Sequence, residues 1–324
     1  IYTLSDDVAW SRGAHNFKFG TLLNYIEQYK SSSSQLRGQV RFAGVSQFLT
    51  GIARDWARIE PGSRLDRAYD TNTYGFYVQD DWRVTSRLTM NLGLRYEFHD
   101  TFQETGGLGA AVRDLVTDSA PTLGEPFKNP SKKNFSPRFG FAWDAFGDGK
   151  TAVRGGFGLL YDIALYGGSL SASTTTPPFS TSSSFTNTGN LPVSVPLVFP
   201  SSVVGRALRI MDYNTQQPHI LQYNFTIERQ LPGNMALTTA FAGSRGYNLI
   251  VVTEGNPTIA RVPTGNSCSP NAPFQSDLNG PKCWTGNEPR TNPLRTVNGQ
   301  PLGWDNIELR TASSNSLYNS LQLG

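Results

Sequence analysis

The side chains best able to do chemistry are three histidines and two cysteines. His15, His99 and His219 lie far apart in the chain, and their spacing matches neither a metal site nor a Ser/His/Asp grouping. The glycines of RGGFGLL, residues 154–160, resemble the start of a dinucleotide-binding loop, but a third glycine, a following helix and a downstream acidic partner are missing. The sequence therefore predicts no enzyme activity, no metal site and no cofactor.

Cys268 and Cys283 are the only cysteines of the chain, and they lie in a segment rich in Pro, Gly and Asn. This placement favours one disulfide within a loop, formed in an oxidising compartment. Two unrelated free thiols are the alternative. If the cysteines are bonded, their Cα atoms should lie within about 7 Å of each other.

The polar side chains must be positioned by strands, because the sequence alternates strictly. In RLTMNLGLRYEFHD, residues 87–100, every second residue from Leu88 to Phe98 is apolar, and the residues between are polar or glycine. A period of two is typical of a strand whose faces meet different solvents. The recurring alternation predicts an all-β fold whose strands are antiparallel neighbours in one sheet, near residues 2–12, 15–28, 70–84, 87–100, 135–145, 150–163, 219–231, 235–250 and 306–323.

Short and long connections alternate between these strands. Short, turn-forming links such as Thr85-Ser86 join the strands in pairs, whereas long connections cover roughly residues 29–69, 101–134, 164–217 and 253–305. A helical turn is expected at Val45–Ala53. This rhythm is typical of an up-and-down transmembrane β-barrel with short periplasmic turns and long extracellular loops, and aromatic residues near the strand ends suit its two interfacial girdles. A soluble β-sandwich is the alternative, but it does not need strands of ten or more residues.

Composition narrows the class of protein further. The 324 residues include 28 basic and 25 acidic side chains, so the net charge of +3 does not indicate a nucleic-acid partner. The mean hydropathy is -0.36 and no stretch approaches the length of a transmembrane helix, but a barrel is apolar on only one face of each strand. The chain begins at Ile1 without the features of a signal peptide, and we expect a mature piece or a fragment.

Charged residues on the polar face are candidates for a functional role inside the barrel. One interpretation is that they form cross-strand ion pairs that fill a wet interior. The other is that they hold a plug domain or line a substrate path. The residues assigned to this face are Arg95, Glu97, Arg138, Asp144, Arg154, Asp162 and Glu228.

The register of the hairpin formed by residues 70–100 can also be predicted. Its apolar residues have even numbers in both strands, so the numbers of opposing partners must add to an even sum. A sum of 170 would place Arg83 directly opposite Arg87, and like charges there would cost stability. We therefore predict a sum of 172. It places Phe76 opposite Tyr96, and Tyr77 opposite Arg95 with the possibility of a cation–π contact.

Three stretches carry a resemblance to a known family: YGFYVQDDWRVTSRLTMNLGLRYE (74–97), NFSPRFGFAWDAFGDGKTAVRGGFGLLYD (134–162) and HILQYNFTIERQLPGNMALTTAFAGSRG (219–246). They resemble the barrel region of Oar-like TonB-dependent receptors, and AHNFKFG (14–20) and YNSLQLG (318–324) extend the resemblance over most of the chain. The resemblance implies active uptake across the outer membrane of a Gram-negative bacterium, powered through a TonB-type energy-transducing protein. It also implies that residues 1–324 are an internal part of a larger barrel of about twenty-two strands, without the plug, the energy-coupling box and the final strand.

Two other functions remain open beside transport: a surface-binding, adhesive or structural barrel, and a passive channel. A plug and a coupling box in the full-length gene would decide for transport. The expected partners are outer-membrane lipid, the TonB-type protein and an extracellular ligand, either peptide or protein or carbohydrate. Loop aromatics could contact that ligand or pack against one another. They are Tyr166, Phe179, Phe185, Trp284 and Trp304.

Overall fold

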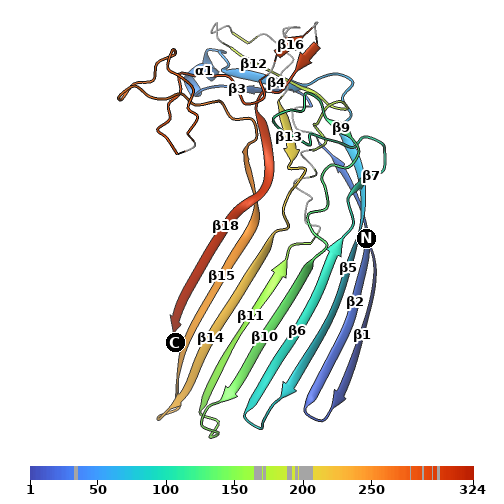
Figure 1. Cartoon of the computed structure of the whole chain (residues 1–324), viewed down its shortest axis with the longest axis vertical. Coiled ribbons are helices and arrows are strands. Elements are labelled where there is room, and N and C mark those ends of the chain that lie inside the picture. Colours follow the sequence, from blue (N-terminus) through green and yellow to red (C-terminus); the bar gives the residue numbers. More distant parts are fainter. Residues whose placement is uncertain are drawn as a thin grey trace.

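The computed structural model of the protein is almost entirely β (Figure 1). It describes residues 1–32, 36–163, 170, 173–187, 192–193, 196, 207–277, 279–286, 288–293, 295–297 and 300–324. No helix in this part of the chain is long and apolar enough to cross a membrane.

Nine long strands form one tilted, open sheet, and each lies beside its neighbour in the chain order (Figure 1). All eight neighbouring pairs are antiparallel, as the alternation predicted. The strands are β1 (Tyr2–Arg12), β2 (His15–Ser31), β5 (Asp66–Arg83), β6 (Leu88–His99), β10 (Asn134–Asp144), β11 (Thr151–Tyr161), β14 (His219–Leu231), β15 (Met235–Glu254) and β18 (Ile307–Leu323). The sheet does not close into a barrel, because β1 and β18 are not paired with each other.

The structure departs from the predicted strands at the long-loop end. β2 and β5 pair with each other up to Ser31 opposite Asp66, and β15 runs to Glu254, so the sheet is taller there than the sequence predicted. A further strand, β13 (Leu208–Met211), pairs in parallel with the start of β18, where the sequence predicted only a loop. Parallel pairing joins segments that are far apart in the chain, so no local sequence pattern predicts it.

The register of the β5–β6 hairpin is the predicted one. Every opposing pair adds to 172, from Thr73 opposite His99 to Arg83 opposite Thr89. Arg95 lies opposite Tyr77 as predicted, but its guanidinium donates to Glu97 at 2.6 Å, and the possible cation–π contact with Tyr77 is not formed.

Apolar side chains cover the outer face of the sheet. Phe76, Leu94, Phe157 and Phe241 are all among its exposed large apolar residues, as expected of a surface that meets lipid rather than water. Their polar neighbours in sequence lie on the opposite face. Polar residues occur on the outer face too, for example His15 and Asp80 at the short-turn end, which lie 2.7 Å apart.

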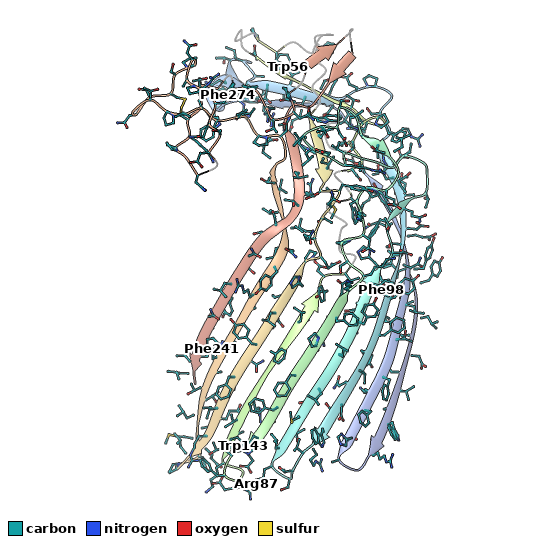
Figure 2. The ribbon with its side chains drawn as sticks, in the orientation of Figure 1. Trp56, Arg87, Phe98, Trp143, Phe241 and Phe274 are labelled. Carbon is teal, nitrogen blue, oxygen red and sulfur yellow. A yellow bond between two sulfur atoms is a disulfide. The ribbon has the colours of Figure 1, made fainter. Side chains whose placement is uncertain are left out.

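Aromatic rings gather at both ends of the outer face. At the long-loop end the ring centroids of Tyr96 lie 4.6 Å from Phe135 and 5.3 Å from Phe98. At the short-turn end Trp10 stacks on Phe17 at 5.6 Å. Figure 2 shows Phe98 near the long loops and Trp143 beside the short turns. This is the arrangement of two interfacial girdles.

The long loops fold into a small layer over the end of the sheet, which we call the loop cap (Figure 1). It comprises the described residues of 32–65, 100–133, 163–218 and 255–306. β3 (Gln39–Arg41), β4 (Asp55–Ile59) and β12 (Ser182–Thr186) form a three-stranded sheet. α1 (Val45–Leu49) falls inside the predicted helical turn. The other cap strands are β7 (Gln103–Glu104), β8 (Ala110–Ala111), β9 (Thr122–Leu123), β16 (Arg295–Val297) and β17 (Gln300–Leu302).

Two buried apolar clusters fasten the cap to the upper ends of the strands. Loop and strand residues contribute to both, so the hydrophobic core lies at the long-loop end and not on the outer face of the sheet. The first cluster contains Tyr69, Phe102, Phe127, Leu170 and Met211. The second contains Val112, Leu208, Ile210, Trp304, Ile307 and Leu309.

Candidate functional site

The polar face of the sheet, which we call the lumen wall, is built in rows. Because the register of each strand pair places polar residues opposite polar residues, side chains from different strands lie side by side on this face. One row crosses all nine strands and begins at Ala9 on β1 and ends at Tyr318 on β18. Its members between these ends are Lys18, Gln79, Gly93, Arg138, Gly158, Gln222 and Ser244. Every residue between the two ends of this row is polar or glycine, which suits a wall that faces water.

Arg138 is the central charge of this wall. Its partners on both neighbouring strands are glycines, Gly93 and Gly158, so no side chain stands beside it in its row. Within the described part of the chain, neither Arg138 nor Lys18 takes part in an ion pair. Both line a hollow of about 280 Å³ together with Tyr77, Gln79 and Arg95, among others. The hollow is therefore basic.

The other predicted charges of the lumen wall have different surroundings. Arg95 pairs with Glu97 on its own strand at 2.6 Å, and Arg154 pairs with Glu228 on the next strand at 3.4 Å. Arg154 and Glu228 form a cross-strand ion pair of the kind that the first interpretation described, whereas Arg95 and Glu97 pair within one strand.

Two predicted lumen carboxylates lie at the ends of strands instead. Asp144 accepts hydrogen bonds from the backbone N–H groups of Gly147 and Gly149 at 3.0 and 3.1 Å, so it holds a short turn. Asp162 lies at the long-loop end of β11, and its Oδ1 is buried without a hydrogen-bond partner in the described part of the chain. Neither carboxylate belongs to the row of Arg138.

Two tyrosines tie the outermost strands to the sheet: Tyr77 from the lumen wall, and Tyr223 from the apolar face, where it lies opposite Phe157. The Tyr77 hydroxyl reaches across Gly20 and donates to Asp7 on β1 at 2.7 Å. The Tyr223 hydroxyl donates to Asn319 on β18 at 2.8 Å, across Gly243. A side chain at either glycine would occupy the space of the tyrosine ring, which explains why the rows contain glycine there. The sequence prediction missed this pairing, although each tyrosine has a glycine opposite it in the register.

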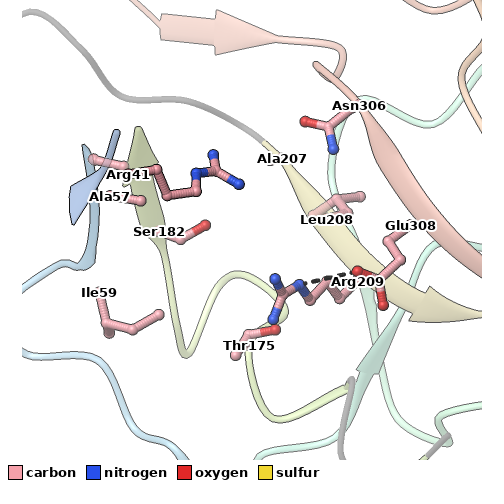
Figure 3. Close-up of a pocket in the computed structure, with 11 residues that line it drawn as sticks. Arg41, Ala57, Ile59, Thr175, Ser182, Ala207, Leu208, Arg209, Asn306 and Glu308 are labelled. Atoms are coloured by element: carbon pink, nitrogen blue, oxygen red, sulfur yellow. Dashed lines mark ion pairs between the residues drawn. The ribbon is translucent and has the colours of Figure 1, made fainter. Parts of the chain in front are cut away.

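A second candidate site is a pocket of about 170 Å³ in the loop cap (Figure 3). It lies between the β3–β4–β12 sheet and the paired starts of β13 and β18. Figure 3 shows the guanidinium groups of Arg41 on β3 and Arg209 on β13 directed into this space. The pocket is lined by Arg41, Ala57, Ile59, Thr175, Ser182, Ser183, Ala207, Leu208, Arg209, Asn306 and Glu308.

Asp55 orients the first of these arginines. It is 8% exposed and accepts hydrogen bonds from Nε of Arg41 and, at 2.7 Å, from Nε of Arg54. Burial acts to raise the pKa of Asp55, but the hydrogen bonds from Arg54 and Arg41 outweigh it, so the pKa lies below its usual value. Asp55 is therefore charged at neutral pH and holds both guanidinium groups in place.

Comparison with known proteins agrees with this architecture. The model of one family, the outer membrane beta barrel domain, matches residues 1–324. The chain belongs to this family. It is therefore a barrel domain of the bacterial outer membrane, with its apolar face toward the lipid, and it is not an enzyme. No curated protein matches the sequence.

Several solved outer-membrane proteins are similar in structure to the barrel domain. The transporter YddB from Escherichia coli is 14% identical, with a TM-score of 0.45 over 78% of this chain and 26% of its own. The siderophore receptor PirA from Acinetobacter baumannii is 12% identical, with a TM-score of 0.42 over 99% and 33%. The ferric enterobactin receptor PfeA of Pseudomonas aeruginosa is 12% identical, with a TM-score of 0.43 over 84% and 30%. The chain thus spans about a quarter to a third of their length.

The predicted loop aromatics that the structure describes are dispersed, and none of these lines the pocket. Tyr166 and the side chain of Phe185 lie outside the described residues. Phe179 is half-buried beneath Arg67, with 5.7 Å between the guanidinium carbon and the ring centroid. Trp304 is fully buried, and its Nε1 donates to the carbonyl of Asp118 at 2.7 Å, so its ring has no surface to offer to a ligand. Trp284 is 53% exposed.

A disulfide links two segments within residues 255–306 of the loop cap. Cys268 and Cys283 form the predicted disulfide, with their Cα atoms 5.5 Å apart. Arg261 pairs with Glu288 at 3.2 Å and lies 4.5 Å from the ring centroid of Phe274 (Figure 2). Hydrogen bonds from Thr285 and Gly286 hold the pKa of Glu288 at about 2. Among the described residues, no cluster of His, Cys, Asp or Glu could hold a metal ion.

Proposed function

We propose that this barrel domain is the wall and the ligand-capturing cap of an outer-membrane receptor of the Oar-like TonB-dependent kind. Its long loops face the cell exterior and capture a ligand that is too large or too scarce for a passive pore. Energy then reaches the receptor through a TonB-type protein, which contacts a part of the receptor other than the barrel wall, and the ligand passes along the lumen wall.

The observation that carries this proposal is the structural difference between the two ends of the sheet. The short-turn end has only tight links, whereas the long-loop end carries a folded cap with its own buried core and a charged pocket. A wall built only to span the membrane does not need such a cap. The resemblance of residues 74–97, 134–162 and 219–246 to Oar-like receptors supports the same assignment.

The lumen wall is the second support. Its row of polar residues and glycine forms a surface in which Arg138 and Lys18 have no ion-pair partner within the described part of the chain. Such unpaired cations suit contact with a plug domain or with a passing ligand rather than an interior filled by its own ion pairs. A passive channel and an adhesive barrel are the rival functions. In a receptor, solutes should reach the lumen wall only when the cell is energised, whereas in either rival their access should not change with the energy supply.

A cysteine in the wall tests the proposal without knowledge of the ligand. We expect Ser244→Cys in the full-length protein, in living cells, to react with a membrane-impermeant maleimide several-fold faster when the cells are energised than after treatment with a protonophore. Cys268 and Cys283, the two cysteines of residues 1–324, are bonded to each other and do not interfere. Thr117→Cys, in the exposed part of the cap, is the matched control and should react equally in both conditions.

The rival functions give different results in the same assay. Rapid labelling of Ser244→Cys in both conditions would indicate a passive channel. Protection in both conditions would indicate a closed barrel with an adhesive or structural role. Either outcome would overturn the proposal.

A further inference from the structure

We infer that the pocket in the loop cap binds a small anionic group, a carboxylate or a phosphate, carried by the ligand that the receptor captures. The inference rests on the proposed function, because it names the chemistry that the cap recognises. It depends on how charge is arranged around the pocket, on the groups that line it and on its size.

Two triads of charged residues face each other across the pocket. In the first, Asp55 is held between Arg41 and Arg54. In the second, Glu308 is held between Arg209 on β13, at 3.3 Å, and Arg310 on β18, at 2.9 Å. Each triad contains two guanidinium groups and one carboxylate, so each keeps one positive charge that is not neutralised.

The unneutralised charge is directed at the empty space. Arg41 and Arg209 line the pocket, and their side chains are 50% and 42% exposed, so both guanidinium groups keep N–H donors free for a ligand. The carboxylate of Glu308 also lines the pocket, but Arg209 and Arg310 each hold one of its oxygens. A cationic ligand would therefore meet two arginines and an acid that is already paired.

The neutral lining favours an anion as well. Ser182 and Asn306 present a hydroxyl and an amide at the edge of the space between the arginines, as Figure 3 shows. Both are donors of the kind that surround bound carboxylate and phosphate oxygens. Since no aromatic residue lines the pocket, the stacking platform that sugars commonly use is missing.

The size of the pocket limits what enters it. About 170 Å³ is smaller than a typical pocket for a drug-sized molecule, so the pocket takes one group of a ligand and not a whole large ligand. Guanidinium groups match the planar, two-oxygen geometry of carboxylates and the oxygens of phosphates. The occupant we assign is thus an anionic group on a solute from outside the cell.

Binding of simple anions to the purified full-length protein in detergent tests this inference by calorimetry. We expect citrate or inorganic phosphate to bind, and glucose not to bind. Arg41→Gln and Arg209→Gln should each weaken anion binding at least tenfold, and the double variant should abolish it. Each acid keeps its other arginine in the single variants, so neither substitution leaves a buried carboxylate unpaired.

Arg64→Gln is the matched control, because Arg64 is an exposed cap arginine that pairs with Asp66 outside the pocket. It should bind the anions within twofold of the unchanged protein. Absence of citrate and phosphate binding, or binding by the two pocket variants as tight as that of the unchanged protein, would overturn the inference. So would binding only to vesicles of an anionic phospholipid, since the ligand would then be the membrane itself.

The failure of this inference can be told apart from the failure of the proposed function. Anion binding that depends on Arg41 and Arg209, together with energy-independent labelling of Ser244→Cys, would overturn transport and leave the anion site in place. Energy-dependent labelling without any anion binding would overturn the anion site alone.

Discussion

Gly303→Ala is expected to unfold the loop cap while the nine-stranded sheet stays folded. Gly303 has a φ of +75°, a conformation that disfavours a side chain, and a Cβ there would lie 2.1 Å from the carbonyl oxygen of Pro293. The clash is with backbone, so no side-chain rotation relieves it. We expect a loss of at least about 3 kcal/mol in the stability of the cap, combining strain and steric terms.

The damage should spread because Gly303 precedes the centre of the second cluster. Trp304 is fully buried, its Nε1 donates to Asp118, and its carbonyl accepts a hydrogen bond from the side chain of Asn256 at 3.0 Å. Displacement of Trp304 would therefore loosen the loops of residues 100–133 and 255–306 at once.

Limited proteolysis and hydrogen exchange, read separately for cap and strands, would measure this effect. Gly265→Ala is the matched control, since Gly265 has a φ of +62° but nothing within 4 Å of its Cβ position. It should show only the conformational cost, about 1 kcal/mol. Equal protection of the cap in the two variants would contradict the expectation.

Gly156→Ala is expected to weaken the sheet itself. A Cβ at Gly156 would lie 2.7 Å from the carbonyl oxygen of Phe139 and 3.3 Å from Cα of Gly140, both on β10. The two strands approach too closely there for any side chain, so β10 and β11 would have to separate. We expect about 2–3 kcal/mol of destabilisation, in the range of overpacked sites.

The neighbouring glycine of the same strand and face provides the control. At Gly158 the nearest atom to a Cβ is Cγ of Arg138 at 3.5 Å, which is an ordinary contact, so Gly158→Ala should change stability by less than about 0.5 kcal/mol. The urea midpoints of the folded barrel in detergent measure the difference. If both variants had the same urea midpoint, the close approach of β10 to Gly156 would not be what excludes a side chain there.

The sheet could be predicted from the sequence because one face of every strand meets lipid. Apolar residues therefore recur at every second position in residues 87–100 and in the other strands. The repulsion between Arg83 and Arg87 was then enough to choose the register of the hairpin. The parallel strand β13 could not be predicted, because its pairing with Ile307–Arg310 depends on a contact between segments about a hundred residues apart.

The sites were less accessible to prediction. Arg138 could be assigned to the lumen wall from alternation alone, but its isolation between Gly93 and Gly158 follows only from the pairing of three strands. The pocket brings Arg41 and Arg209 together from two loops that share no pattern. Trp304 shows the converse, because an aromatic residue in a long loop is exposed only if the loop lacks a core of its own, and this loop has one.

The most direct test of the whole account is the solvent that each face of β6 meets. Nitroxide labels placed singly at residues 92, 93, 94 and 95 of the full-length protein in membranes can be read for collisions with oxygen, which dissolves in lipid, and with a water-soluble nickel chelate. The account predicts that oxygen dominates at positions 92 and 94 and the nickel chelate at positions 93 and 95, since Leu92 and Leu94 are exposed on the apolar face and Gly93 and Arg95 stand on the lumen wall. Equal accessibility at all four positions, or loss of the alternation, would contradict it.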